Sequence, residues 1–240
     1  MKLNLLSAGT TNAKTIKNES ETYILYLAPA RQNSTGKSVC PHASAGCTSA
    51  CLYTAGRGAF TNVQNARIRK TDLFFENRNL FLNMLILDLN KINEKARKEN
   101  KTIYVRLNGT SDLDFDKLLK LSFRPSLQDF SNLKFYDYTK DKVRARVQAS
   151  SMHPNWIDNY KVTYSRSEKS TDVELISLLN EGVNVAVVFK DELPFKYLGF
   201  PVINGDATDL RYNDAKGCIV GLKAKGKAKK DTSGFVVTEY

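Results

Sequence analysis

The sequence predicts an α/β fold of the (β/α) barrel type, either a closed TIM-like barrel or a partial one. Short apolar segments with strand character recur between polar or helical segments along the 240 residues. Strands that alternate with helices pair in parallel through right-handed crossovers. Seven such segments, or eight with the N-terminus, are the number expected for a barrel, whereas an open doubly wound sheet usually has fewer. No repeat or linker divides the chain, so we expect a single domain over residues 1–240.

The order of the elements follows from the apolar patterns. Residues 3–6 are a candidate first strand, and residues 22–28 form an aromatic and branched strand that Pro29 ends. Residues 60–101 contain no Gly or Pro and show apolar residues at helical spacing, which predicts two helices separated at residues 77–79. The remaining predicted strands are 103–107, 133–138, 160–164, 183–189, 201–203 and 218–222, and the remaining helices are 114–121, 142–148 and 171–181. Thr171 is the expected N-cap of the last helix.

Polar side chains follow six of the predicted strands. In parallel α/β folds, the carboxyl ends of the strands meet and form the active site. A polar loop alone means little, because most loops are polar, but six in succession favour a shared pocket. The residues that we expect to bind a cofactor or ligand there are Asn108, Asp112, Lys190 and Asp206, with Ser165, Asn204 and Lys223 beside them.

Three of the four cysteines lie in the long loop after the strand 22–28, which predicts a metal centre on that loop. Cys40, Cys47 and Cys51 have the spacing C-x6-C-x3-C, and thiolates are soft ligands suited to iron–sulfur clusters or zinc. Structural zinc usually takes four protein ligands, often from C-x2-C pairs, which this loop lacks. The pattern therefore favours a [4Fe–4S] cluster with zinc as the alternative. The alternative without a metal is that the three cysteines are unrelated buried thiols.

The fourth ligand of such a cluster is not evident from the sequence. Cys218 opens a predicted strand, so it should lie at the far end of the fold, roughly 15 Å from the pocket. We therefore interpret Cys218 as a small core residue. His42 lies within the cysteine loop and is a candidate fourth ligand or a neighbour of the site.

Composition limits the compartment and the partners. The chain is 42% apolar and 25% charged, which is typical of soluble globular proteins, and it contains no apolar run as long as the roughly 20 residues of a membrane helix. The N-terminal apolar stretch is too short for a secretory signal, and the cysteine usage suits a reducing compartment. A net charge of +11 attracts polyanions, so nucleic acid is a candidate partner. The alternative is a solvated surface rich in lysine.

Several motifs resemble those of the phage "gene product 88" family. They are CLYTAGRG at 51–58, RLNGTSD at 106–112, GDATDLR at 205–211 and IVGLKAKG at 219–226. The resemblance covers about residues 20–237 and implies a virus-encoded protein in the cytoplasm of the infected bacterium.

The cysteine loop and recurring strands are also similar in outline to radical-SAM enzymes. Those enzymes hold a three-cysteine cluster at the mouth of a barrel, and the resemblance implies S-adenosylmethionine as a second cofactor. Their cysteine spacing is C-x3-C-x2-C, which differs from the spacing in this chain.

Together these observations predict a phage-encoded [4Fe–4S] protein with its site at the mouth of a barrel. An open iron would bind a small polar or anionic ligand as a Lewis acid, or would transfer an electron. One alternative is a nucleic-acid-binding phage protein, acting in replication or host interaction, with a structural cluster or zinc. Another is a host-interaction protein without catalysis. The sequence leaves open whether the chain is an enzyme.

Overall fold

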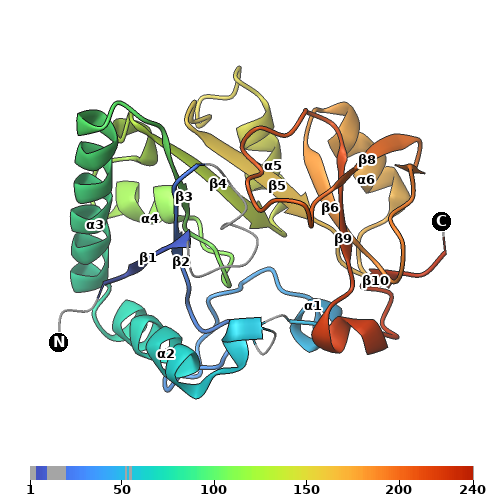
Figure 1. The fold of residues 1–240 in the computed structure, drawn as a ribbon, viewed down its shortest axis with the longest axis horizontal. Coiled ribbons are helices and arrows are strands. Elements are labelled where there is room, and N and C mark those ends of the chain that lie inside the picture. Colours follow the sequence, from blue (N-terminus) through green and yellow to red (C-terminus); the bar gives the residue numbers. More distant parts are fainter. Residues whose placement is uncertain (1–3, 10–19, 52, 54–55, 240) are drawn as a thin grey trace.

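A ten-stranded, mostly parallel sheet forms the centre of the molecule (Figure 1). The structure is a computed structural model that describes residues 4–9, 20–51, 53 and 56–239. The strands are β1 (Leu6–Ala8), β2 (Thr22–Leu25), β3 (Ile103–Arg106), β4 (Leu133–Thr139), β5 (Tyr160–Ser165), β6 (Asn184–Phe189), β7 (Lys196–Tyr197), β8 (Phe200–Asn204), β9 (Ile219–Lys223) and β10 (Val236–Val237).

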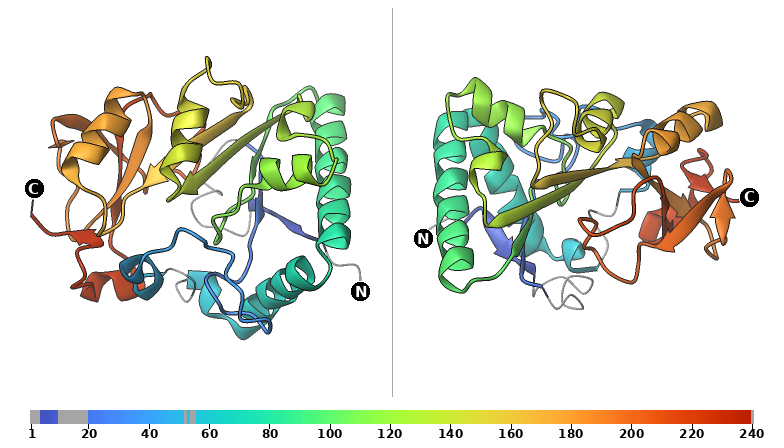
Figure 2. Two further views of the ribbon diagram at one scale, coloured as in Figure 1. Left: turned by 180° about the vertical axis from the view of Figure 1, so that it is seen from behind. Right: turned by 90° about the horizontal axis from the view of Figure 1, so that it is seen from above.

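Helices connect most of the parallel strands. The α-helices are α1 (Ala45–Ser49), α2 (Thr61–Glu76), α3 (Arg78–Lys98), α4 (Phe115–Leu121), α5 (Lys142–Ala149) and α6 (Asp172–Asn180). The short 3₁₀ helices are η4 (Gly56–Ala59), η5 (Leu127–Asp129) and η6 (Gly226–Lys230). Helices α4, α5 and α6 lie along one side of the sheet (Figure 2, right).

Alternating residues of the strands bury one face of the sheet against the helices. Ile103 and Val105 of β3 pack with Leu85 and Leu89 of α3 in one core cluster. Further along the sheet, residues of β6 pack with Leu175 and Leu178 of α6 in a second cluster. Strands β2 to β6 and β9 pair in parallel, so their carboxyl ends lie at the same edge of the sheet.

The expected closed barrel is not what the structure shows, because the described sheet is open. Strands β2 to β6 are neighbours in chain order, as in a barrel, but β9 then lies between β6 and β8. The sheet has β1 at one edge and β7 at the other, and β1 and β7 each pair antiparallel with their neighbour. β9 therefore pairs inside the sheet and is not available to close it onto the first strands.

The connection between β8 and β9 also crosses the face that a barrel would enclose. Asp209 of this connection accepts hydrogen bonds from Arg106 Nη1 of β3 at 3.0 and 3.1 Å. The Tyr212 ring lies edge-on to the Tyr104 ring, with 5.9 Å between centroids. The connection thus covers part of the inner face of the sheet.

The predicted elements are largely confirmed. All seven principal strands are present, and the predicted break between two helices lies at Asn77, whose side chain accepts a hydrogen bond from Leu80 N. Thr171 caps α6 in a capping box with Glu174. The first strand is shifted to Leu6–Ala8 from the predicted residues 3–6, of which residue 3 lies outside the described residues. Strands β7 and β10, of two residues each, were too short to leave a pattern.

Candidate functional site

A cavity of about 330 Å³ lies at the carboxyl ends of the parallel strands. Its walls come from the ends of β3, β4, β5 and β9, from the cysteine loop and from Phe235 just before β10. The cavity is lined by all three loop cysteines, Cys40, Cys47 and Cys51, and by charged side chains that include Arg106, Asp112, Lys140, Asp206, Asp209, Lys223 and Lys225. The fold therefore brings the cysteine loop to the edge where polar residues were expected.

Hydrogen bonds hold Cys40, and a short helix positions the other two cysteines of the loop. The Cys40 Sγ accepts a hydrogen bond from Ala30 N at 3.4 Å and donates one to Thr110 O at 3.9 Å. Cys47 lies within α1, and Cys51 follows the end of that helix. Among the described residues, no three His, Cys, Asp or Glu side chains are close enough together to form a metal-binding group.

Helix α1 is held by Glu168 from the connection between β5 and α6. Ser44 caps α1: its Oγ accepts from Cys47 N at 3.1 Å and donates to Glu168 Oε2 at 2.6 Å. The other Glu168 oxygen accepts from Gly46 N at 2.9 Å. A Cβ at Gly46 would lie 2.4 Å from Ser233 Oγ and 2.8 Å from Phe235 Cβ, so only glycine permits this close approach. Glu168 therefore sets the position of Cys47.

Burial favours the neutral form of the three thiols. It raises the pKa of Cys40 to about 12 and raises the pKa of Cys47 and Cys51. The neighbouring charge of Lys140 acts in the opposite direction on Cys47, and that of Arg67 on Cys51. A metal that binds here would displace the thiol protons, and these cations would stabilise the resulting thiolates.

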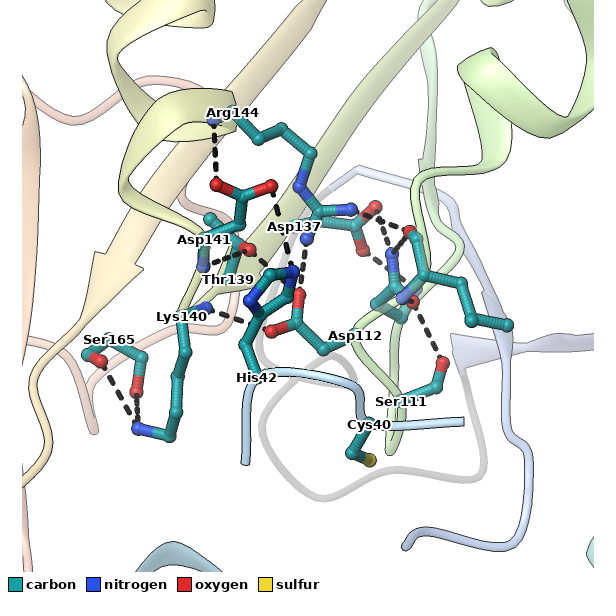
Figure 3. Close-up of polar contacts among 12 residues, drawn as sticks. Cys40, His42, Ser111, Asp112, Asp137, Thr139, Lys140, Asp141, Arg144 and Ser165 are labelled. Carbon is teal, nitrogen blue, oxygen red and sulfur yellow. Dashed lines mark hydrogen bonds and ion pairs between the residues drawn. The ribbon is translucent and has the colours of Figure 1, made fainter. Parts of the chain in front are cut away.

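A buried polar network supports the cavity wall beneath Asp112 (Figure 3). Asp112 accepts hydrogen bonds from Thr139 Oγ1 at 2.7 Å and from Lys140 N at 2.9 Å, and it pairs with the buried Arg144. Arg144 Nη1 also donates to Leu113 O at 2.6 Å. These contacts join the loop after β3 to the end of β4 and the start of α5.

Asn108 belongs to the same network. Its backbone N donates to Asp137 Oδ1 at 2.7 Å and its Nδ2 to Asp137 Oδ2 at 3.0 Å. Asp137 also accepts from the Tyr160 hydroxyl at 3.1 Å. Burial raises the pKa of Asp137 to about 6, although Arg144 and the Asn108 hydrogen bonds oppose the rise.

A family model described as Gene product 88 matches residues 4–239. The chain belongs to the gene product 88 family. This match confirms the resemblance to that phage family and identifies the chain as a bacteriophage protein. No curated protein and no solved structure matches the chain, so the outline resemblance to radical-SAM enzymes gains no support.

In this gene product 88 family member, the four predicted ligand-binding residues divide into two groups. Asp112 and Asp206 line the cavity. Asn108 lies buried behind the wall, and the exposed Lys190 does not line the cavity. The backbone N of Lys190 donates to Val237 O at 3.0 Å, because β10 pairs with the end of β6.

The secondary predictions for the pocket also divide. Ser165 and Lys223 line the cavity, whereas Asn204 does not; its side chain accepts from Asp206 N at 2.9 Å. Cys218 is buried just before β9, where its thiol donates to Ala215 O, and it does not line the cavity. The His42 ring faces Asp141, with 3.7 Å between Nε2 and Oδ2.

Lys140 is the main cavity residue missing from the predicted set. Its ammonium donates to Ser165 O, Ser165 Oγ and Arg166 O at 3.0–3.1 Å and lies 5.0 Å from the Phe235 ring centroid. Its place directly after β4, equivalent to the place of Lys190 after β6, was the signal that could have identified it.

Of the helices in the described ranges, none combines the length and apolarity needed to span a bilayer.

Proposed function

We propose that this phage protein holds a [4Fe–4S] cluster on Cys40, Cys47 and Cys51 and uses it on a small polar or anionic ligand. The observation that carries the proposal is the convergence of these three cysteines on one cavity at the carboxyl ends of parallel strands. The cavity already contains carboxylate and ammonium groups, which suits a ligand smaller than a polymer. We place the protein in the cytoplasm of the infected host.

The residues fit a cluster in donor type and in charge. Three thiols supply soft ligands, and a cluster with three thiolates is anionic, which matches the cationic Arg106, Lys140 and Lys223 on the wall. Loading would have to draw the sulfurs together from the described arrangement. When bound, the cluster would supply electron transfer or Lewis-acid chemistry.

The chain's own residues would then orient the ligand. Lys140 is held by three oxygen acceptors, so its charge is fixed at the wall. Asp206 accepts from Lys223 N at 2.9 Å and from Lys225 Nζ at 2.8 Å, so it fixes the end of β9 at the cavity. Phe235 and Tyr138 provide the apolar surface that limits water around the ligand.

Anaerobic purification with iron, sulfide and zinc analysis tests the proposal. We expect a brown protein that contains iron and sulfide, and loss of both after changing Cys40, Cys47 or Cys51 to Ser. Cys218→Ser is the matched control and should retain them, because Cys218 lies outside the cavity. A colourless protein with stoichiometric zinc would contradict the cluster and support the zinc alternative.

A second candidate function, nucleic-acid binding with a structural metal, rests on the lysines beside the cavity. Lys223 and Lys225 line the cavity, and Lys227, Lys229 and Lys230 follow in η6. Ala228 of η6 packs with Ala50 of the cysteine loop, so this basic segment lies beside the thiols. DNA binding that weakens steeply with salt, in a protein whose metal does not respond to small ligands, would favour this function.

A further inference from the structure

Arg67 of α2 is a cation without an anionic partner in the described part of the chain. Its guanidinium carbon lies 4.9 Å from the Tyr26 ring centroid and 5.5 Å from the Tyr53 ring centroid. Its Nε and Nη1 are buried and have no hydrogen-bond partner among the described residues. Arg67 is half-buried, and no ion pair joins it to a described carboxylate, whereas Arg106, Arg144 and Arg211 each have one.

Such an arrangement is unfavourable unless an anion completes it. Buried donors that make no hydrogen bond, and a charge that has lost water without gaining a counter-charge, both destabilise the folded protein. The two tyrosine rings offset only part of this effect, because cation–π contacts are weaker than a paired charge. Burial lowers the pKa of Arg67, but a guanidinium stays charged at neutral pH.

The location of Arg67 links it to the cavity. Tyr53, whose ring lies 5.5 Å from the Arg67 guanidinium carbon, lines the cavity, and so does Cys51, whose pKa is raised by burial against the opposing charge of Arg67. The backbone at Gly58 also approaches closely: a Cβ there would lie 2.2 Å from Tyr53 O and 3.3 Å from Arg67 Nη1. Arg67 itself does not line the cavity, but its guanidinium lies against a residue that does.

We propose that Arg67 forms an anion-binding site beside the cysteine end of the cavity, and that it receives a phosphate or carboxylate group of a ligand. A guanidinium donates charged hydrogen bonds, which the oxygens of these oxyanions accept. Since Nε and Nη1 are closed off from solvent, binding through them requires the groups packed against the guanidinium to move. The site goes beyond the proposed cluster, because an oxyanion can bind Arg67 in the metal-free protein.

The test uses the metal-free full-length protein, titrated with inorganic phosphate and with citrate at constant ionic strength. We expect both probes to raise the melting temperature and change the tyrosine fluorescence of the wild type. In Arg67→Gln the apparent affinity should fall by about tenfold or more, because a charged hydrogen bond is lost. Arg67→Lys should be intermediate. Arg69→Gln, an exposed change on the same helix, should bind like the wild type.

The melting temperature without anion separates this role from a structural one. Removing an unpaired cation should leave the melting temperature of Arg67→Gln equal to that of the wild type or above it. A clear decrease in both Arg67→Gln and Arg67→Lys, with the phosphate and citrate shifts preserved, would show a structural role and overturn the proposal. The proposal would also be overturned if neither phosphate nor citrate changed the melting temperature of the wild type. The same holds if Arg67→Gln bound both anions like the wild type while its iron content in the loaded protein was lower. Iron content itself tests the cluster, so the two proposals can fail separately.

Discussion

Asp137 is a fully enclosed carboxylate that holds the cavity wall from below. It accepts two hydrogen bonds from Asn108 and one from Tyr160, so the loop after β3 depends on it. These donors satisfy its oxygens, but burial still disfavours the negative charge and raises the pKa to about 6. The carboxyl therefore binds a proton more tightly in the folded protein than in the unfolded chain.

Stability should consequently fall as the pH rises from about 4 to about 6. The folded pKa of about 6 lies above the ordinary value of 3.8, so the contribution of the proton is fully present below pH 3.8 and is lost as the pH rises through 6. The shift corresponds to a decrease on the order of 3 kcal/mol in the free energy of unfolding. We expect the wild type to lose about this much relative to Asp137→Asn between pH 4 and 7, measured by urea denaturation.

The exposed Asp191→Asn is the control for this measurement. It also removes one carboxylate, but one outside the network of Asn108 and Tyr160, so it controls for the change of charge alone. A constant difference between Asp137→Asn and the wild type across the same pH range would show that Asp137 has an ordinary pKa in the folded protein.

Single residues also show how far the site could be predicted. Position after a strand correctly identified Asp112 and Asp206, because the carboxyl ends of parallel strands do meet at the cavity. The same rule gave Asn108 and Lys190, which the structure places elsewhere. The Asn108 side chain is drawn inward by Asp137, and Lys190 continues the pairing of β6 with β10, which a two-residue strand does not reveal in sequence.

Among the elements, α1 is the shortest helix of its type in the described chain, and it positions a cysteine through contacts outside itself. A helix of five residues is not stable alone. It is held by the Ser44 and Gly46 contacts to Glu168 and by the close approach of residues 233–235. The position of Cys47 thus depends on segments more than a hundred residues away in the chain.

Loosening this helix should expose the cysteine loop before the rest of the protein. Glu168→Gln replaces one hydrogen-bond acceptor with a donor. Gly46→Ala places a Cβ 2.4 Å from Ser233 Oγ. Each change should lower the free energy of unfolding by about 1–3 kcal/mol. We expect faster proteolytic cleavage within residues 40–51 and, in protein loaded with the proposed cluster, faster iron loss. The exposed Glu76→Gln should change neither, and an equally resistant loop in Glu168→Gln would show that Glu168 does not hold it.

The elements were predictable where local signals agree. Caps such as Thr171 and Asn77 combine with apolar spacing, so the helix boundaries could be read from the sequence. Strand order could not, because β9 has the same apolar pattern whether it pairs between β6 and β8 or closes a barrel. Pairing order depends on long-range contacts that leave no period in the sequence.

At the scale of the whole molecule, the β8–β9 connection occupies the face that a barrel would enclose. Its anchor is the ion pair between Asp209 and Arg106, whose side chains are 8% and 15% exposed. Arg106 also stacks on the Tyr138 ring, with 4.8 Å to the centroid, at the cavity wall. The pair of Asp209 and Arg106 therefore joins the β8–β9 segment to the sheet at the wall of the cavity.

Breaking the pair from one side should be strongly destabilising. Asp209→Asn leaves the Arg106 charge buried and unpaired, and we expect the free energy of unfolding to decrease by about 3–5 kcal/mol. The double variant Arg106→Met/Asp209→Asn should recover part of this loss, since no uncompensated charge remains. A loss below about 0.5 kcal/mol for Asp209→Asn, as for an ordinary surface change, would mean that the pair does not anchor the connection.

The strand β6 has three partners, and two of them come later in the chain. β5 pairs with residues 184–186, β10 continues the same edge at residues 188–189, and β9 covers the opposite edge. β6 is strongly apolar, with the sequence Asn-Val-Ala-Val-Val-Phe. Until residues beyond 218 have folded, one whole edge of this strand offers unpaired backbone groups to any other extended chain. Folding intermediates and shortened chains are therefore prone to aggregate through β6, whereas in the folded protein β6 lies between strands on both of its edges.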